Sequence, residues 1–180
     1  TLEMVTDEER DYMNRVYAAD PQARINFGIR RRLAPLLDNN RRRIELMNAL
    51  LFSLPGTPVL YYGDELGMTD TPVPPLRVRD PREIRQPGKG LNRDPVRTPM
   101  PWAPYPSAGF TTGEPWLPFG EDHALRNVET LMTDQSSIPN LYRALLALRR
   151  SRPSIAIGDI ANVAASDGVL SYERRRGDER

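Results

Sequence analysis

Two short motifs hold the residues whose types and spacing could support catalysis or binding. The first is YYGDE at residues 61–65, in which Tyr62, Asp64 and Glu65 follow a short apolar run at residues 57–60. Alpha/beta barrels collect their active-site groups at the carboxyl ends of their strands, so both acids would lie at such a place if the run is a strand. A Gly-Asp-Glu sequence after a strand also makes an ordinary turn and helix cap, and the motif alone leaves both interpretations open.

The second motif is DPVRTPMPW at residues 94–102, whose one cation is Arg97. Its planar guanidinium could bind an anion or the hydroxyl groups of a sugar. It could equally tie the loop to an acid such as Glu65. The motif by itself does not separate a binding role from a structural one.

The other candidates are a single histidine and several aromatic residues. His123, in GEDHALRNVE, is interpreted as a surface or loop-packing residue rather than a sugar ligand. Trp102, Trp116 and Phe119 are expected in the core of the surrounding loop, and stacking of one ring on a sugar is the alternative.

Composition excludes several classes of site. The 180 residues include no Cys and one His, which rules out disulfides, thiolate metal sites and histidine-based metal clusters, so we expect no metal and no cofactor. The 25 basic and 24 acidic side chains give a net charge of +1, too little for nucleic-acid binding. Arginine clusters at 30–32, 41–43 and 174–176 are interpreted as solvated helix faces and loop pairs.

The longest apolar run, residues 49–54, is far shorter than the roughly 20 residues of a membrane span. We therefore expect no membrane segment, and the first ten residues do not read as a secretory signal.

The first half of the chain contains signals for two helices and a strand. Thr6 and Glu9 form a capping-box pattern for a helix over residues 7–19. Asn39 or Asn40 can cap a second helix, and residues 55–56, Pro-Gly, end it. Its predicted buried face is Ile44, Met47, Leu51 and Leu54, widened by Leu46 and Leu50. The apolar run at residues 57–62 is typical of a strand buried on both faces of a parallel sheet. Helix, tight turn and strand make half of an α/β repeat.

The second half begins with a long proline-rich segment. Of the 18 prolines, 12 fall between residues 72 and 118, which indicates either a long ordered loop or disorder, and the aromatic residues favour the ordered loop. Ser136 or Ser137 caps a last helix, which ends at residues 149–150. Its expected buried face is made of Leu141, Tyr142, Leu145 and Leu148. Residues 155–160 and 168–172 are predicted strands.

The two motifs together resemble a known family. LPGTPVLYYGDELGM followed by DPVRTPMPW is similar to the eighth-strand region and downstream loop of the α-amylase superfamily, glycoside hydrolase family 13. Residues 1 to about 65, beginning TLEMVTDEERDYM, resemble the trehalose synthases of that superfamily (maltose α-D-glucosyltransferases). Residues from about 66 onward, with AGFTTGEPWLPFGED, resemble its bacterial α-glucosidases. Pro101 stands where the trehalose synthase form of the loop motif has Gln, and it agrees with the α-glucosidase form.

The resemblance implies a fold and a division of the chain. The expected fold is α/β, namely the C-terminal part of a (β/α)8 TIM barrel followed by the truncated start of an antiparallel β domain. Residues 1–150 would be the barrel portion and residues 151–180 the start of the β domain.

The resemblance also implies a function. Family members hydrolyse α-glucosides with retention, through two carboxylates about 5 Å apart. The nucleophile, the acid/base and a third Asp are expected before Thr1, so no catalytic residue is expected in this chain, which alone should be inactive. Arg97 matches a substrate-contacting arginine, and Glu65, with the weaker candidates Asp64 and Tyr62, would orient the site. The parent protein is expected to be a cytoplasmic α-glucosidase acting on maltose or short α-glucosides. The alternatives are a trehalose synthase and a non-catalytic carbohydrate- or partner-binding fragment.

Overall fold

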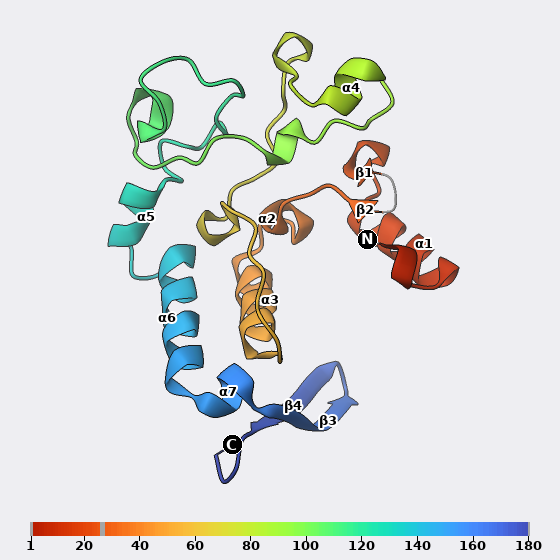
Figure 1. Cartoon of the computed structure of the whole chain (residues 1–180), viewed down its shortest axis with the longest axis vertical. Coiled ribbons are helices and arrows are strands. Elements are labelled where there is room, and N and C mark those ends of the chain that lie inside the picture. Colours follow the sequence, from red (N-terminus) through yellow and green to blue (C-terminus); the bar gives the residue numbers. More distant parts are fainter. Residues whose placement is uncertain (1, 26–27, 180) are drawn as a thin grey trace.

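Two helices, α3 (Arg41–Ser53) and α6 (Ile138–Ser151), form the main core of the computed structural model, which describes residues 2–25 and 28–179. They lie side by side (Figure 1), and the rings of Phe52 and Tyr142 meet edge-on between them, with centroids 5.4 Å apart. The rest of the buried cluster is Ala34, Ile44 and Ile138, with Leu37 and Leu145 packed against it. This core supports the segment that carries the YYGDE motif.

The predicted helix caps are confirmed. The side chain of Asn40 accepts a hydrogen bond from the backbone of Arg43, and Ser137 caps α6 in the same way. At α1 (Asp7–Tyr17) the Thr6 hydroxyl accepts from the backbone N of Glu9, while Glu9 accepts from the backbone N of Thr6. Because these side chains satisfy amides that a helix start leaves unpaired, the starts of all three helices could be located from sequence.

The buried face of α3 differs from the prediction. Ile44, Asn48 and Phe52 are buried, whereas Met47 is 40% exposed and Leu46 is 66% exposed. Residues four apart form one ridge of a helix, and this ridge is the one that packs against α6. Asn48 can be buried because its side-chain amide donates to the carbonyl of Ile44 at 2.9 Å.

The predicted strand at residues 57–62 does not form. Val59 is 85% exposed and Leu60 is 40% exposed. The sheets within residues 2–25 and 28–179 are two hairpins, β1 (Arg24–Ile25) with β2 (Gly28–Ile29), and β3 (Asp159–Ser166) with β4 (Val169–Arg175). An apolar run becomes a strand only when a neighbour satisfies its backbone groups, and none of these strands pairs with it.

The proline-rich segment is ordered, as the aromatic residues indicated. It is built of the short helix α4 (Pro81–Arg85) and single turns at Pro75–Arg77, Asp94–Val96 and Pro106–Gly109. Figure 1 shows it as the green part of the chain, extending beyond the amino end of α3. The expected placement of its tryptophans was wrong, since Trp102 is 50% and Trp116 is 80% exposed. Phe119 is half-buried.

Short helices connect the remaining parts. They are α2 (Leu33–Leu36) before α3, α5 (Val128–Thr133) before α6, and α7 (Pro153–Ile157) after it. The last replaces the first half of the strand predicted at 155–160, because Pro153 has the fixed φ that suits the first turn of a helix.

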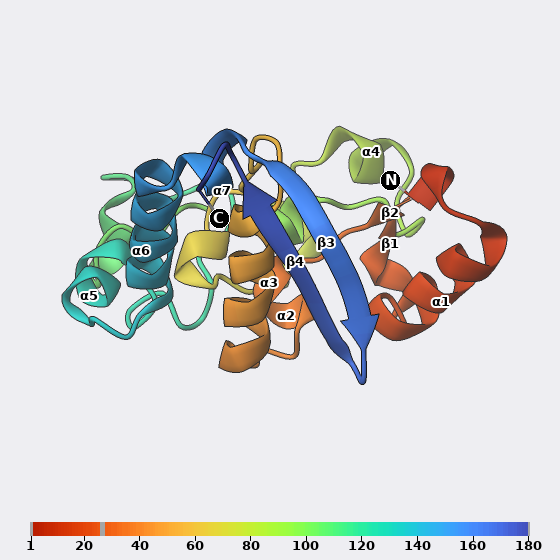
Figure 2. The same cartoon turned by 90° about the horizontal axis from the view of Figure 1, so that it is seen from below.

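The C-terminal hairpin lies at the carboxyl end of α3, as Figure 2 shows from below, and Arg149 of α6 and Arg174 of β4 both bind that end of the helix. Its strands pair antiparallel from Asp159 opposite Arg175 to Ser166 opposite Val169. Arg149 donates to the carbonyl of Phe52 at 2.7 Å, and Arg174 donates to the carbonyl of Ser53 at 2.6 Å. The carboxyl end of a helix leaves carbonyls unpaired and carries partial negative charge, so both cations are well placed there. Arg174 is buried, contrary to the solvated placement expected for its cluster.

Substitution of Phe52 tests the corrected face of α3. Phe52→Ala is expected to lower the free energy of unfolding by about 3–5 kcal/mol, because it removes a buried ring and leaves a cavity against Tyr142. Leu46→Ala, on the exposed side of the same helix, should change it by less than about 0.5 kcal/mol. Urea unfolding of the 180-residue chain measures both. Equal losses at the two positions would contradict the observed packing.

Candidate functional site

The YYGDE motif forms a tight turn that requires a glycine at its third position. Gly63 has a φ of +87°, and a side chain there would clash with the sulfur of Met68 and lie 2.9 Å from Nη1 of Arg32. The carbonyl of Gly63 accepts from the amides of Leu66 and Met68, at 3.1 and 2.9 Å. The single helical turn Asp64–Leu66 follows and places both acids of the motif.

Both acids bind backbone amides in this structure. Glu65 Oε2 accepts a hydrogen bond from the amide of Gly63 at 2.7 Å, and Asp64 Oδ1 accepts one from the amide of Leu33 at 3.4 Å. Burial raises the pKa of Asp64, although the Leu33 amide and the charge of Arg32 act in the opposite direction. The two carboxylates therefore stabilise the turn, which is the alternative use that the sequence left open.

Arg32 organises the turn, and sequence reasoning missed it. The residue is 1% exposed, contrary to the solvated placement expected for its cluster. Its Nη1 donates to the carbonyl of Tyr62 at 2.6 Å, and its guanidinium lies 5.3 and 4.9 Å from the ring centres of Tyr61 and Tyr62. Its backbone amide donates to Asp70 at 2.8 Å, and burial raises the pKa of that acid. Nothing in the run of arginines at residues 30–32 distinguishes its third member, because the contacts come from residues about 30 positions later.

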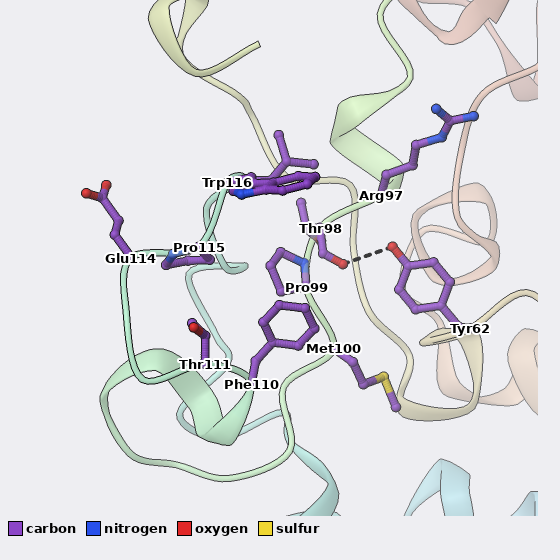
Figure 3. Close-up of a pocket in the computed structure, with 11 residues that line it drawn as sticks. Tyr62, Arg97, Thr98, Pro99, Met100, Phe110, Thr111, Glu114, Pro115 and Trp116 are labelled. Carbon is purple, nitrogen blue, oxygen red and sulfur yellow. Dashed lines mark hydrogen bonds between the residues drawn. The ribbon is translucent and has the colours of Figure 1, made fainter. Parts of the chain in front are cut away.

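The two tyrosines hold the loop on either side of Arg97. The hydroxyl of Tyr61 donates to the carbonyl of Val96 at 3.0 Å, and that of Tyr62 donates to the carbonyl of Thr98 at 2.9 Å. Figure 3 shows the second bond as a dashed line. Burial raises the pKa of Tyr62, which keeps its hydroxyl protonated as a donor. The YYGDE turn and the DPVRTPMPW loop, separated by more than 30 residues, thus form one unit.

Arg97 itself is exposed. In the described residues, 2–25 and 28–179, no carboxylate forms an ion pair with it, so the expected contact with Glu65 is not made here. Arg97 and Tyr62 lie on the lining of a hollow with a volume of about 510 Å³. Phe110 and Trp116 line the hollow on the side away from Tyr62, and Glu114 lies at its outer edge with its carboxylate pointing outward (Figure 3).

His123 packs within the loop. Its Nδ1 lies 2.8 Å from the carbonyl of Gly120, and its ring centre is 5.3 Å from that of Phe119. These contacts agree with the loop-packing interpretation. His123 is not among the residues that line the hollow beside Arg97.

A buried ion pair fixes the base of the loop. Both oxygens of Asp80 accept from the guanidinium of Arg93 at 2.7 Å, and Asp80 also accepts from the backbone amides of Arg82 and Arg93. The hydrogen bonds from Arg93 hold the pKa of Asp80 well below its usual range. The adjacent Asp94 binds the amides of Arg79 and Asp80 at 2.6 and 2.9 Å, which closes the segment that leads to Arg97.

Asp80→Asn is expected to destabilise the loop by about 3 kcal/mol, because it removes the charge that the buried pair requires. A carboxyl whose pKa is lowered by folding stabilises the protein above its unfolded-state pKa of about 3.9, and this contribution is lost as the pH falls towards the lower folded-state value. The difference between wild type and Asp80→Asn in urea unfolding should therefore be full at pH 7 and shrink below about pH 4. A difference independent of pH would contradict the role of the charge.

Comparison with known proteins identifies the family. Residues 23–158 match the family model described as alpha amylase, catalytic domain. The chain belongs to the α-amylase family. This result agrees with an α/β architecture, and the solved structures that resemble this chain include the α-glucosyl transfer enzyme XgtA, with a TM-score of 0.68 and 38% identity over 74% of this chain and 25% of that one.

The individual relatives include a trehalose synthase and a probable α-glucosidase. The trehalose synthase/amylase TreS of Mycobacterium tuberculosis is 48% identical over 97% of this chain and 28% of its own length. A probable α-glucosidase of Rhizobium meliloti is 35% identical over 76% of this chain and 25% of its own length. This chain therefore spans about a quarter of the length of these relatives. The similarity to trehalose synthase is not limited to residues 1–65, since it extends over nearly the whole chain. Within the described residues, no helix is long and apolar enough to cross a membrane.

Proposed function

We propose that this chain is the last part of the catalytic barrel of a trehalose-synthase-type enzyme. This enzyme transfers α-glucosyl groups and interconverts maltose and trehalose. The observation that carries the proposal is the similarity to a trehalose synthase over 97% of the chain. Residues 1–150 would belong to the barrel and residues 151–180 to the start of the following β domain. The family match ends at residue 158, which is compatible with a boundary in this region.

In the proposed enzyme this chain binds and orients the substrate, while the reacting carboxylates come from other parts of the barrel. Arg97 would donate hydrogen bonds from its planar guanidinium to sugar hydroxyls or to a neighbouring acid. Tyr62, Asp64 and Glu65 would hold the turn beside it, as their hydrogen bonds in this chain do. Retention requires a covalent glucosyl intermediate, formed by one carboxylate while a second protonates the departing sugar.

The fate of that intermediate decides the reaction. If water attacks it, maltose is hydrolysed to two glucose molecules. If the departed glucose stays in the site, turns over and attacks with its anomeric hydroxyl, the product is trehalose. The second outcome requires a site that retains glucose and excludes water.

A second candidate function is α-glucosidase activity. The loop motif favours it, because Pro101 agrees with the α-glucosidase form of the motif, and so does the similarity to the Rhizobium protein. In this case the complete protein would release glucose from maltose without forming trehalose.

Incubation of the complete protein with maltose distinguishes the trehalose synthase function from the α-glucosidase function. Proton NMR of the mixture should show trehalose accumulating faster than free glucose. Glucose alone would establish the α-glucosidase, and no change in maltose would contradict both functions. Arg97→Ala should raise the KM for maltose while circular dichroism remains unchanged, because the exposed side chain forms no ion pair within residues 2–25 and 28–179.

A further inference from the structure

Two exposed aromatic rings stand in the wall of the hollow opposite Tyr62. Trp116 is 80% exposed and Phe110 is 49% exposed, and both line the hollow (Figure 3). Large aromatic side chains are seldom left in water unless they serve a contact, because their burial is strongly favourable. Because the rings lie beside Arg97, a ligand in the hollow should have an apolar face for the rings and polar groups for the guanidinium.

Contacts behind the wall hold these rings in place. Arg77 donates to the carbonyl of Pro115 at 2.5 Å and forms an ion pair with Glu114 at 3.5 Å. The ring of Phe110 packs edge-on against Phe119, with centroids 6.3 Å apart. A binding surface fixed in this way loses little conformational freedom when a ligand arrives.

The lining suits a sugar ring better than an apolar segment of protein. A hexose has an apolar face of C–H groups that can lie on an aromatic ring and a rim of hydroxyls that can bind Arg97. An apolar side chain would remove water from the charge of Arg97 and offer it no partner. The hollow combines the two aromatic rings with Thr111, Glu114 and Arg97. Its volume of about 510 Å³ lies within the usual range for small-molecule sites.

We propose that Trp116 and Phe110 form a platform for the glucose unit that leaves the glucosyl group and attacks again. This inference rests on the proposed function, and it adds the residues that would retain the free sugar. Trp116 would stack on the face of the ring, while Arg97 would meet its hydroxyls.

The test compares three variants of the complete protein with wild type. Trp116→Ala should raise the KM for maltose and the inhibition constant of glucose about 10-fold, equivalent to about 1.4 kcal/mol of binding. It should also shift the products from trehalose towards glucose, because glucose escapes more readily. Trp116→Phe should recover most of the loss, since it restores a ring. Trp102→Ala is the matched control, because that side chain is also exposed but does not line the hollow.

Two results would overturn the inference. One is an unchanged KM and product ratio in Trp116→Ala. The other is a loss of stability in urea without any change in glucose affinity, which would mean that another part of the barrel covers the rings. Saturation-transfer NMR with glucose on the same four proteins needs no turnover. A signal that depends on Trp116 in a protein that leaves maltose unchanged would reject the proposed function but keep the sugar platform.

Discussion

Arg32→Met is expected to lower the free energy of unfolding by about 3 kcal/mol at pH 7. The substitution removes one charged hydrogen bond, to the carbonyl of Tyr62, and the stacking of the guanidinium on Tyr61 and Tyr62. Such a hydrogen bond contributes about 1.5–3 kcal/mol and each stacking contact about 0.5–2 kcal/mol. Part of this stabilisation is offset in the wild type, because Nε and Nη2 of Arg32 are buried and find no hydrogen-bond partner among the residues that the structure describes.

The pH dependence of this loss identifies its cause. Burial raises the pKa of Asp64, and the charge of Arg32 acts against this effect. Without the cation, the pKa of Asp64 should rise further. A carboxyl whose pKa is raised by folding favours the folded state when protonated, so the variant should lose less stability at pH 4 than at pH 7. Carbon NMR titration of the Asp64 carboxyl measures this pKa directly.

Arg31→Met provides the matched control. Arg31 is the neighbouring arginine, and its guanidinium binds the carbonyls of Tyr17 and Pro35, away from the two tyrosines. Its removal should leave the pKa of Asp64 nearly unchanged. If both variants shifted Asp64 equally, general positive charge rather than the position of Arg32 would be responsible. Loss of Arg32 should also raise the KM for maltose in the complete protein, since the tyrosines that flank Arg97 lose their support.

Local signals in the sequence were enough to predict the three longest helices, α1, α3 and α6. The hydrogen bonds of the Thr6, Asn40 and Ser137 caps involve residues three positions away, so the relevant partners are visible in a short window. The same holds for the break at residues 55–56. These signals fix where a helix starts and ends, but not which face it buries. The face of α3 depends on Tyr142, almost 100 residues later, and was predicted wrongly for that reason.

The strand and the site required information from further away. The run at residues 57–62 has the composition of a buried strand, yet its pairing partners would have to come from other segments. The two motifs were found from their residue types and their resemblance to a family. Arg32, which supports the first motif, carries no such signal, because its contacts at the turn are with residues 61–62. Trp116 has an aromatic neighbour pattern that favours a packed loop, and only the structure shows that its ring faces a hollow.

The largest effect is expected when the 180-residue chain is compared with the complete protein. The chain alone should convert neither maltose nor a chromogenic α-glucoside above the background without enzyme. Retaining chemistry needs two carboxylates on opposite sides of the bond, about 5 Å apart. The hollow beside Arg97 has one carboxylate in its lining, Glu114, and that side chain is paired with Arg77.

Asp64 and Glu65 cannot replace the missing pair, because they are consecutive residues whose carboxylates bind the amides of Leu33 and Gly63. Residues 59–62 are also exposed, so the pocket wall that neighbouring strands would build is not formed by this chain. The assay is glucose and trehalose release by equal molar amounts of the chain and of the complete protein, with the latter as the positive control. Turnover by the chain that disappears in Glu65→Gln would show that a catalytic pair does exist here. Glu65 would then be a reacting group and not only a residue that stabilises the turn.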